Sequence, residues 1–326
     1  MSEIRRIAIF TSGGDAPGMN AAIRAVVRTA NHYDLIVYGI NRGYDGMIDD
    51  DIELLQDEFF RNTIQRGGTI LKSARSEKFK TAEGRLIAYE NLKARDIDAV
   101  ISIGGNGTLT GAGLLTSEHD MCMIGIPSTI DNDLFGTDFT IGFDTAVNTA
   151  VEIVDKIRDT ADSHNRIFLI EVMGRDSGYI ALNVALASGA SALVVPEKNT
   201  SIDQLVADLK KSLRRKKLFG LVILAEGNQL GETSDIAKLL KERIPEYDIR
   251  STILGHIQRG GSPTAHDRIL AGKYGYEAVK ALMEGKRNVM VGFVNNQLTF
   301  TSFLDAVTKI KQPSQYDIGI AEILGR

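Results

Sequence analysis

Short, almost continuous apolar runs alternate along the chain with longer segments that have a helical pattern. Residues 7–11, 99–103 and 122–126 are examples of the short runs, which are typical of strands buried in a parallel sheet. Residues 19–31 and 145–162 are examples of the predicted helices. The alternation predicts an α/β fold with mainly parallel sheets and right-handed crossovers.

The predicted strands are residues 7–11, 35–40, 99–103, 122–126, 166–172, 192–195, 221–225, 249–254 and 289–294. The predicted helices are residues 19–31, 83–93, 145–162, 178–188, 202–213, 234–243, 265–284 and 303–310, with one more beginning near residue 109. Residues 42–46 are predicted to be a loop, and the chain after residue 310 is predicted to be a tail that contains Gln and Pro.

Length and composition describe an ordinary globular protein that is large enough for two domains. The chain has 326 residues, of which 43% are hydrophobic and 25% are charged, and this length exceeds the usual size of one domain. A net charge of −4 and a pI near 5.8 argue against nucleic acid as the main partner. An anionic ligand therefore needs a local cluster of basic residues.

Cysteine usage and the N-terminal residues favour a cytoplasmic protein. Cys122 is the only cysteine and lies in an apolar run, so no intrachain disulfide forms and we expect a reducing compartment. The apolar stretch before Gly13 is too short for a signal peptide. No apolar run approaches the length that spans a membrane.

Two glycine-rich loops each join a predicted strand to a predicted helix. They are residues 12–18 (SGGDAPG) and 104–108 (GGNGT), and loops of this kind expose backbone N–H groups to a phosphate at a helix N-terminus. Neither has the spacing of a Walker loop or of a dinucleotide-binding loop. Tight turns are the alternative interpretation of these glycines.

A polar run (PSTIDND) follows the predicted strand 122–126. Its residues Asp131 and Asp133, with the hydroxyl of Thr129, offer a proton acceptor and a metal contact in one loop, although Asn and Asp are also common in turns. Ligands of open α/β sheets bind at the carboxyl ends of strands. The polar run and the two glycine-rich loops therefore predict one cleft for a polyphosphate.

Other polar residues allow both a functional and a structural interpretation. Tyr44 could cover a ring, and Arg75 could contact a phosphate or be a surface charge. The basic residues 214–217 follow a predicted helix, where they could be a solvated cap that suits the helix dipole. His256 alone would be a core or turn histidine, but glycines and Arg259 nearby favour phosphate binding.

Six motifs occur in the order found in one enzyme family: TSGGDAPGMN, RGGTILKSAR, GGNGT, PSTIDND, EVMGRDSG and GHIQRGG. Over essentially its whole length the chain resembles bacterial ATP-dependent 6-phosphofructokinases, the phosphofructokinase A family. The resemblance implies two doubly wound α/β domains and a homotetramer with shared active sites. It implies a nucleotide-binding domain of residues 1–141 plus 257–307 and a sugar-phosphate-binding domain of residues 142–256 plus 308–326.

The activity implied by the resemblance is that of an ATP:D-fructose-6-phosphate 1-phosphotransferase of glycolysis. It transfers a phosphoryl group from MgATP to the C1 hydroxyl of the sugar and gives fructose 1,6-bisphosphate. Asp131 would accept the proton of that hydroxyl, and Thr129 would hydrogen-bond the moving phosphoryl group. Asp133 would support the metal and the loop, while Arg175 would face the transition state.

The resemblance also implies the binding residues. The nucleotide contacts are Gly13, Gly14, Tyr44, Arg75, Ser76, Gly105, Asn106, Gly107, Thr108 and Gly111. The sugar-phosphate contacts are Thr129, Ile130, Asp131, Arg166, Met173, Gly174, Arg175, Glu226, Arg250, His256 and Arg259. Among these, Arg166 and Arg250 would come from the neighbouring subunit. Mg²⁺ is the implied cofactor, with Asn106 and Asp133 as its protein contacts.

The chain departs from the family pattern beside the predicted phosphoryl path. Asn106 stands where an aspartate usually contacts Mg²⁺, and Ser128 replaces a usual glycine. Pyrophosphate-dependent relatives tend to carry Asp at the Gly107 position and Lys at the Ser128 position, so ATP is favoured here. A pyrophosphate-dependent enzyme and a weakly catalytic regulatory paralogue that binds sugar phosphate are the alternatives.

A further departure concerns the family's effector site for ADP or phosphoenolpyruvate. The matching basic residues are Arg24, Arg28, Arg158, Arg215 and Lys217. However, Ser191 and Asp57 stand where a metal-binding glutamate and another arginine are expected. The resemblance therefore implies that anion binding survives there while activation by Mg-nucleotide is lost.

Overall fold

The protein is described here from a computed structural model, which describes residues 4–56, 60–161, 166–213 and 219–325. The chain folds into two compact units. Unit 1 consists of Met1–Ile130, Leu134–Thr145 and Arg259–Lys311, and unit 2 consists of Asp131–Asp133, Ala146–Gln258 and Gln312–Arg326. The assignment of a nucleotide domain and a sugar-phosphate domain to particular residues stays a prediction.

Unit 1 is built on a seven-stranded sheet of mixed direction. Its strands, in spatial order, are β11 (Gln297–Ser302), β10 (Val289–Val294), β5 (Cys122–Pro127), β4 (Ala99–Gly104), β1 (Arg6–Thr11), β2 (Ile36–Ile40) and β3 (Ile52–Leu54). The five inner strands are parallel, and the edge strands β11 and β3 pair antiparallel. Every residue of β4 and β5 is buried, as expected for strands covered on both faces.

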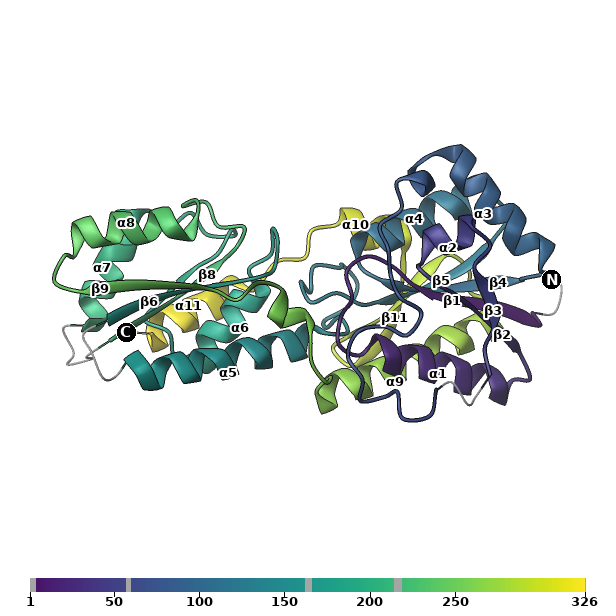
Figure 1. Ribbon diagram of the computed structural model, residues 1–326, viewed down its shortest axis with the longest axis horizontal. Coiled ribbons are helices and arrows are strands. Elements are labelled where there is room, and N and C mark those ends of the chain that lie inside the picture. Colours follow the sequence, from purple (N-terminus) through teal and green to yellow (C-terminus); the bar gives the residue numbers. More distant parts are fainter. Residues whose placement is uncertain (1–3, 57–59, 162–165, 214–218, 326) are drawn as a thin grey trace. The chain divides into compact units, whose positions relative to one another are not determined.

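Helices cover both faces of this sheet (Figure 1). One face carries α1 (Met19–His32) and α9 (Ala265–Met283), which pack against each other. The other face carries α2 (Tyr44–Ile48), α3 (Ala82–Ala94), α4 (Asn106–Glu118) and α10 (Phe303–Thr308), with the short 3₁₀ helix η2 (Lys78–Lys80) beside α2. Phe10, Leu109 and Phe303 belong to the core under this second layer.

Unit 2 is a smaller three-layer unit around a parallel four-stranded sheet. Its strands, in spatial order, are β7 (Ala192–Val194), β8 (Gly220–Ala225), β6 (Arg166–Val172) and β9 (Asp248–Ile253). The helices α7 (Ile202–Leu213) and α8 (Thr233–Arg243) cover one face, and α5 (Phe143–Ala161), α6 (Tyr179–Ser188) and α11 (Gln315–Leu324) lie on the other (Figure 1). The 3₁₀ helix η3 (Gly255–Arg259) follows β9.

The predicted fold class, an α/β protein with two doubly wound parts and mainly parallel sheets, is confirmed. Three local predictions were wrong. Residues 42–46 are not only a loop, because α2 begins at Tyr44; the chain after residue 310 is not only a tail, because it contains α11. Helix α4 begins at Asn106 rather than near residue 109. In α2, the buried side chains of Tyr44 and Met47 hold a five-residue helix that sequence propensity alone does not support.

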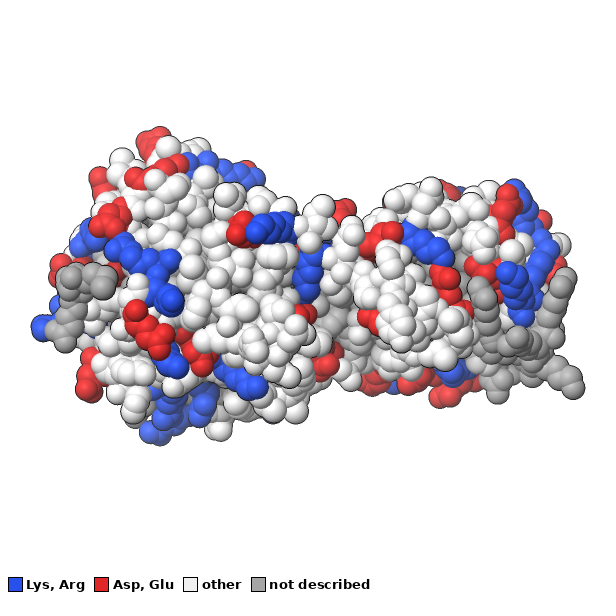
Figure 2. Space-filling model, turned by 180° about the vertical axis from the view of Figure 1, so that it is seen from behind, with Lys and Arg blue, Asp and Glu red and all other residues white. Residues whose placement is uncertain are grey.

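Charges are distributed without a dominant basic surface on the face of the molecule shown in Figure 2, where acidic and basic side chains lie intermixed. Cys122 is buried, and burial raises the pKa of its thiol to about 11. Its position in β5 supports the prediction of a small core residue. Within the described part of the chain, no helix combines the length and the apolar character needed to cross a bilayer.

A buried ion pair ties α3 to α4 in unit 1. The guanidinium of Arg85, which is 7% exposed, donates to both carboxylate oxygens of Glu118 at 2.6 Å. Arg85 Nη1 donates to the carbonyl oxygens of Phe79 at 2.9 Å and Lys80 at 2.8 Å. The hydrogen bonds from Arg85 hold the pKa of the Glu118 carboxyl below its ordinary value of 4.5. Because its charge is matched, Arg85 can stay buried.

Glu118→Gln should lower the free energy of unfolding at pH 7 by about 1–2 kcal/mol, because a partly exposed, charge-assisted pair is lost. The Glu118 carboxyl has a lowered folded-state pKa, so its contribution is complete above pH 4.5 and disappears as the pH falls through the folded-state value. Urea titrations at pH 7 and at pH 3.5–4 should therefore show a difference between variant and wild type that shrinks in acid. Glu152→Gln is the control, since Glu152 pairs with Lys156 in the open, and it should change nothing measurable.

Candidate active site

In unit 1, the loops that follow β1, β4 and β5 gather at one edge of the sheet, because these strands are adjacent and parallel. Backbone hydrogen bonds connect the loops directly. Ser12 N donates to Ile103 O at 3.1 Å, and Ser128 N donates to Gly104 O at 3.0 Å. The structure thus brings together the unit 1 parts of the two glycine-rich loops and the polar run.

Gly104 and Gly107 of the second glycine-rich loop differ in the space around them. A Cβ on Gly104 would lie 2.2 Å from Thr108 Oγ1 and 2.7 Å from Ser12 O, so a side chain there cannot be accommodated. A Cβ on Gly107 would meet nothing within 4 Å. Gly104 is therefore required by packing, whereas the space in front of Gly107 is open to a ligand.

The N-terminus of α4 has the properties of an anion site. Its N-cap residue is Gly105, which carries no side chain to cap the helix, so the positive end of the helix dipole lies at this edge of the sheet. Thr108 is 2% exposed, and among the described residues nothing hydrogen-bonds its Oγ1. A Cβ on Gly105 would lie 3.3 Å from Thr129 Cβ, so Thr129 is adjacent to this turn.

Tyr44 packs in the core beside this helix. It is 5% exposed, its hydroxyl donates to Thr108 O at 2.5 Å, and its ring stacks on Phe79 with centroids 3.8 Å apart. Burial raises the pKa of the Tyr44 phenol above its ordinary value. A Cβ on Gly111 would lie 2.8 Å from the ring. Tyr44 and Gly111 therefore form a wall behind the first turn of α4.

The other predicted nucleotide contacts of unit 1 lie in loops. Gly13 has a left-handed φ of 82°, and a Cβ on Gly14 would lie 2.5 Å from the guanidinium of Arg259. That guanidinium donates to Asp15 O at 3.3 Å. Arg259 therefore lies against the first glycine-rich loop. Two more predicted contacts precede η2: Arg75, which is exposed, and Ser76, whose Oγ accepts from Phe79 N at 3.1 Å.

In unit 2, the Asp131 carboxylate is buried beside a cation. Asp131 is 2% exposed, and Arg175 Nε lies 3.5 Å from its Oδ2. The hydroxyl of Ser177 donates to Asp131 O at 3.1 Å. Arg175 has a left-handed φ of 52° and is half exposed, so its guanidinium can contact both Asp131 and a ligand.

Two side chains hold the loop after β6 through its backbone. Glu226 Oε1 accepts from Arg175 N at 2.7 Å and from Gly174 N at 3.3 Å. Gln258, which is fully buried, accepts from Met173 N at 2.9 Å. The contact of Glu226 with the sugar stays a prediction, whereas the structure shows that Glu226 fixes the turn that carries Arg175.

Arg166, at the start of the inner strand β6, lies next to Arg250 on the neighbouring edge strand β9. Their Nε atoms lie 3.1 Å and 3.0 Å from the same oxygen, Asp248 Oδ2. Arg166 begins β6, whereas Gly174 follows the end of this seven-residue strand. At ~3.3 Å per residue the two ends of β6 are about 20 Å apart. The structure therefore pairs Arg166 with Arg250 and separates this pair from Met173, Gly174, Arg175 and Glu226.

The remaining predicted site residues are distributed over both units. Unit 1 contains Thr129 and Ile130, which are buried. Unit 2 contains Asp133 and the exposed His256, whereas Arg259 belongs to unit 1. Asp133 and Asn106 carry oxygen donors, which suit Mg²⁺. No group of three or more His, Cys, Asp or Glu side chains that could enclose a metal occurs in the described ranges.

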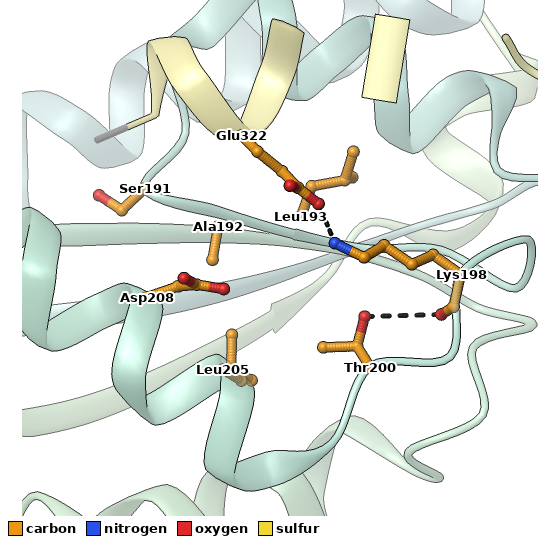
Figure 3. Close-up of a pocket in the computed structure, with 8 residues that line it drawn as sticks. All are labelled: Ser191, Ala192, Leu193, Lys198, Thr200, Leu205, Asp208 and Glu322. Atoms are coloured by element: carbon orange, nitrogen blue, oxygen red, sulfur yellow. Dashed lines mark hydrogen bonds and ion pairs between the residues drawn. The ribbon is translucent and has the colours of Figure 1, made fainter. Parts of the chain in front are cut away.

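The predicted effector residues are only partly described. Arg24 and Arg28 lie on α1, and Arg158 on α5 donates to Ser188 O; Arg215, Lys217 and Asp57 lie outside the described residues. Ser191 Oγ accepts from Leu221 N at 3.4 Å. It lines a pocket of about 20 Å³, with Asp208 and the Lys198–Glu322 ion pair (Figure 3). That volume admits about one water molecule, so this pocket does not admit a nucleotide.

Three residues that contact the predicted site residues were not predicted from the sequence: Ser177, Gln258 and Asp248. Each acts on the backbone or the charge of a predicted site residue. Ser177 lies in the motif EVMGRDSG and Gln258 in GHIQRGG, so the motifs pointed to the right segments. Their individual roles depend on partners 46 and 85 residues away, which sequence spacing does not indicate.

The fold and these strand-end loops define a doubly wound α/β protein with an uncapped helix N-terminus suited to an anion. A family model described as phosphofructokinase matches residues 6–282. The chain belongs to the phosphofructokinase family, which confirms the resemblance seen in the sequence.

Relatives and solved structures agree with this assignment. The chain is 52% identical over 318 residues to ATP-dependent 6-phosphofructokinase 2 of Bacteroides thetaiotaomicron, covering 98% of this chain and 97% of that protein. It is 50% identical over 321 residues to ATP-dependent 6-phosphofructokinase of Cytophaga hutchinsonii, covering 98% of each. The structure of phosphofructokinase from Saccharomyces cerevisiae matches with a TM-score of 0.88 and 36% identity, covering 93% of this chain and 45% of that chain.

A pyrophosphate-dependent phosphofructokinase from Marinobacter aquaeolei also matches, with a TM-score of 0.84 and 23% identity, covering 96% of this chain and 86% of that chain. At this identity the likeness shows the fold alone. The fold is therefore shared with a protein that is named for a different phosphoryl donor.

Gly104→Ala and Gly107→Ala form a matched pair that tests the open space at α4. Gly104→Ala should lower the free energy of unfolding by about 1–3 kcal/mol, because its Cβ overlaps fixed atoms. Gly107→Ala should leave stability unchanged or raise it by up to about 1 kcal/mol, since Ala favours the helix. Denaturant titration of the ligand-free protein measures both. Equal destabilisation by the two substitutions would show that the space at Gly107 is not open.

Proposed function

We propose that the protein is an ATP:D-fructose-6-phosphate 1-phosphotransferase, a kinase of glycolysis that makes fructose 1,6-bisphosphate. The observation that carries the proposal is the N-terminus of α4, where the N-cap Gly105 carries no side chain and Gly107 borders open space. The buried Thr108 hydroxyl beside it has no hydrogen-bond partner among the described residues. A phosphate there would accept from helix N–H groups and from Thr108. The names of the relatives at about half identity support ATP as donor and 6-phosphofructokinase as activity.

The residues of unit 1 would hold the donor. Gly13, Gly14 and Gly105 allow the backbone to approach phosphate closely, and Arg75 adds an exposed positive charge. Thr129 lies beside the first turn of α4, where its hydroxyl can donate to the phosphoryl group in transfer. These contacts position the donor and stabilise its charge, which is most of what catalysis of phosphoryl transfer requires.

The residues of unit 2 would act on the acceptor. The Asp131 carboxylate orients the C1 hydroxyl and takes its proton as the bond to phosphorus forms. Arg175, held near Asp131 at 3.5 Å, balances negative charge in the transition state. Met173, Gly174 and Glu226 would border the sugar, and His256 would bind its 6-phosphate. Arg259, which belongs to unit 1, would also bind the 6-phosphate, since Arg suits bidentate contact with phosphate.

A divalent metal accompanies ATP in kinases, and we propose that it is Mg²⁺ here. Bound with the nucleotide, it neutralises charge on the phosphates. Asp133 would support it with a carboxylate, and Asn106 would contribute an amide oxygen to it or to one of its waters. With an amide in place of a carboxylate at residue 106, we expect an enzyme with a raised Mg²⁺ requirement.

A coupled assay of the purified protein with fructose 6-phosphate tests the proposal, with MgATP or Mg-pyrophosphate as donor. Turnover with ATP alone is expected. Turnover with pyrophosphate alone would make the protein a pyrophosphate-dependent enzyme. Inactivity with both donors, together with binding of fructose 6-phosphate in calorimetry, would make it a regulatory paralogue.

Asp131→Asn should lower kcat by about two to four decades, the usual contribution of a positioned base. The KM values for both substrates should change little, because the amide keeps the shape and one oxygen. Initial-rate kinetics with each substrate varied measures this. Asp235→Asn, on the exposed side of α8, is the control and should keep wild-type kcat. A wild-type kcat for Asp131→Asn would remove the carboxylate from the mechanism.

We also propose that active sites are shared between subunits of a homotetramer. The support is the position of Arg166 at the start of β6, about 20 Å from the end of the strand that precedes Gly174, with Arg250 beside it in register with Phe168. A single chain cannot bring both ends of this strand to one sugar phosphate, so the Arg166–Arg250 pair would serve a site on a neighbouring subunit. Arg250 lies on the edge strand β9, where another subunit can approach it.

Co-expression of Asp131→Asn with Arg250→Ala tests the sharing. Each variant alone should be nearly inactive at low fructose 6-phosphate. In mixed oligomers some sites combine an intact Asp131 with an intact Arg250, and random assembly regenerates about a quarter of the sites. Recovery of this order in purified mixed oligomers is expected. No recovery above the sum of the parents, with mixed oligomers present on native gels, would place both residues in one subunit's site.

An effector site and a location in the cytoplasm complete the proposal. The support for an anionic effector is the presence of Arg24, Arg28 and Arg158, with Arg215 and Lys217 outside the described residues. Ser191 is 8% exposed, and its hydroxyl is hydrogen-bonded to the backbone. A serine side chain also has no carboxylate that could bind a metal. The single buried thiol, Cys122, suits a reducing compartment.

A further inference from the structure

A fully buried carboxylate lies in the first turn of α9. Asp267 is 0% exposed, and its oxygens accept from Gly142 N at 2.9 Å, from Thr145 N at 2.8 Å and from Thr145 Oγ1 at 2.5 Å. Its own N–H donates to Thr264 Oγ1, the N-cap of α9, at 3.2 Å. Three donors satisfy the buried charge, and they come from a segment more than a hundred residues away.

The segment that Asp267 holds, residues 137–145, is called the strap here. It runs along the polar run after β5. Thr140, which is 0% exposed, donates its hydroxyl to Thr129 O at 2.6 Å, and Ile141 N donates to Pro127 O at 3.1 Å. Ser128 and Ile141 also form a parallel bridge. The strap therefore fixes the backbone of the loop at the residues immediately before Asp131.

Two close contacts leave the strap little freedom on its other side. Gly142 has a left-handed φ of 99°, and a Cβ there would lie 2.6 Å from Ala16 Cβ. A Cβ on Gly18 would lie 2.6 Å from Ile141 Cγ2. The strap thus fits between the first glycine-rich loop and the polar run, and the Asp267 carboxylate holds its end.

The other end of the strap is also fixed by buried hydroxyls. The hydroxyls of Thr137 and Tyr274 lie 2.6 Å apart, and Tyr274 donates to Phe139 O at 2.7 Å. Tyr274 is fully buried and comes from α9, as Asp267 does. One helix therefore holds the strap at two places, two turns apart.

We propose that Asp267 and Thr140 are positioning residues for phosphoryl transfer. Asp267 holds the strap, and Thr140 transmits that placement to the Thr129 carbonyl and so to the catalytic loop. Neither residue touches a substrate. The link to catalysis rests on the proposed function, whereas the link from Asp267 to the loop is a property of the ligand-free fold.

Amide hydrogen exchange of the ligand-free protein tests the link in the fold. Asp267→Asn keeps the volume but turns one N–H group toward donors, so the Gly142 and Thr145 amides should exchange at least about tenfold faster. The Ile141 and Ser128 amides should follow, while the Leu282 amide at the other end of α9 should not change. Unchanged exchange at Ile141 and Ser128 would overturn the proposal, whatever reaction the enzyme catalyses.

Kinetics of Thr140→Val tests the link to catalysis. Replacing the hydroxyl of Thr140 by a methyl group should lower kcat about 10–100-fold, as expected for a misplaced catalytic loop. Both KM values should stay within about twofold of the wild-type values. Thr140→Ser restores the hydroxyl and should recover most of kcat. Thr63→Val is the matched control, because Thr63 is 2% exposed and its hydroxyl donates to Phe60 O at 2.9 Å.

The outcomes separate this proposal from the proposed function. Wild-type kcat in Thr140→Val, or an equal loss in Thr63→Val, would reduce the network to a purely structural role and overturn the proposal. If the wild-type enzyme has no activity with ATP or pyrophosphate, the proposed function fails, and the exchange experiment alone decides the role of Asp267 in placing the loop.

Discussion

The parallel pairing of β1, β4 and β5 is the constraint on which the rest of unit 1 depends. Parallel neighbours end at the same edge of a sheet, so three loops that are far apart in sequence must meet there. Their backbones then come so close that Gly104 has no room for a Cβ. The crowding that excludes a side chain at Gly104 and the open space at Gly107 are parts of one arrangement. The packing thus leaves open space at the first turn of α4, beside Gly107.

Within unit 2 the position of the charged side chains depends on the backbone of a turn. Asp131 is nearly buried but has the Arg175 guanidinium beside it, and Arg175 occupies a left-handed conformation that few non-glycine residues adopt. Glu226 stabilises this conformation through two backbone N–H groups. The geometry of the charged pair therefore depends on a carboxylate that touches neither partner's side chain.

Much of the fold and many candidate site residues could be predicted because their signals are local. Apolar runs identify β4 and β5, and the six motifs identify the family. The missed elements have weak local signals: α2 has only five residues, β3 has only three, and the edge strand β11 contains no fully buried residue. Ser177, Gln258 and Asp267 could not be predicted, because a lone hydroxyl, amide or carboxylate gains its role only from distant partners. Tyr44 illustrates another limit, since the sequence suggested that it could cover a ligand ring but gave no sign that it is buried in the core.

The discontinuity of unit 1 has a consequence for synthesis of the chain. Its strand β5 pairs with β10, and its helix α1 packs on α9, yet all of Ala146–Gln258 is translated between them. Unit 2 lacks only α11 and the adjoining residues at that stage, whereas unit 1 still lacks two strands and two helices of its sheet layers. On the ribosome, β5 therefore waits as an unpaired apolar edge until the C-terminal segments emerge. The first half of unit 1 is accordingly the part of the nascent protein most exposed to aggregation and most dependent on chaperones.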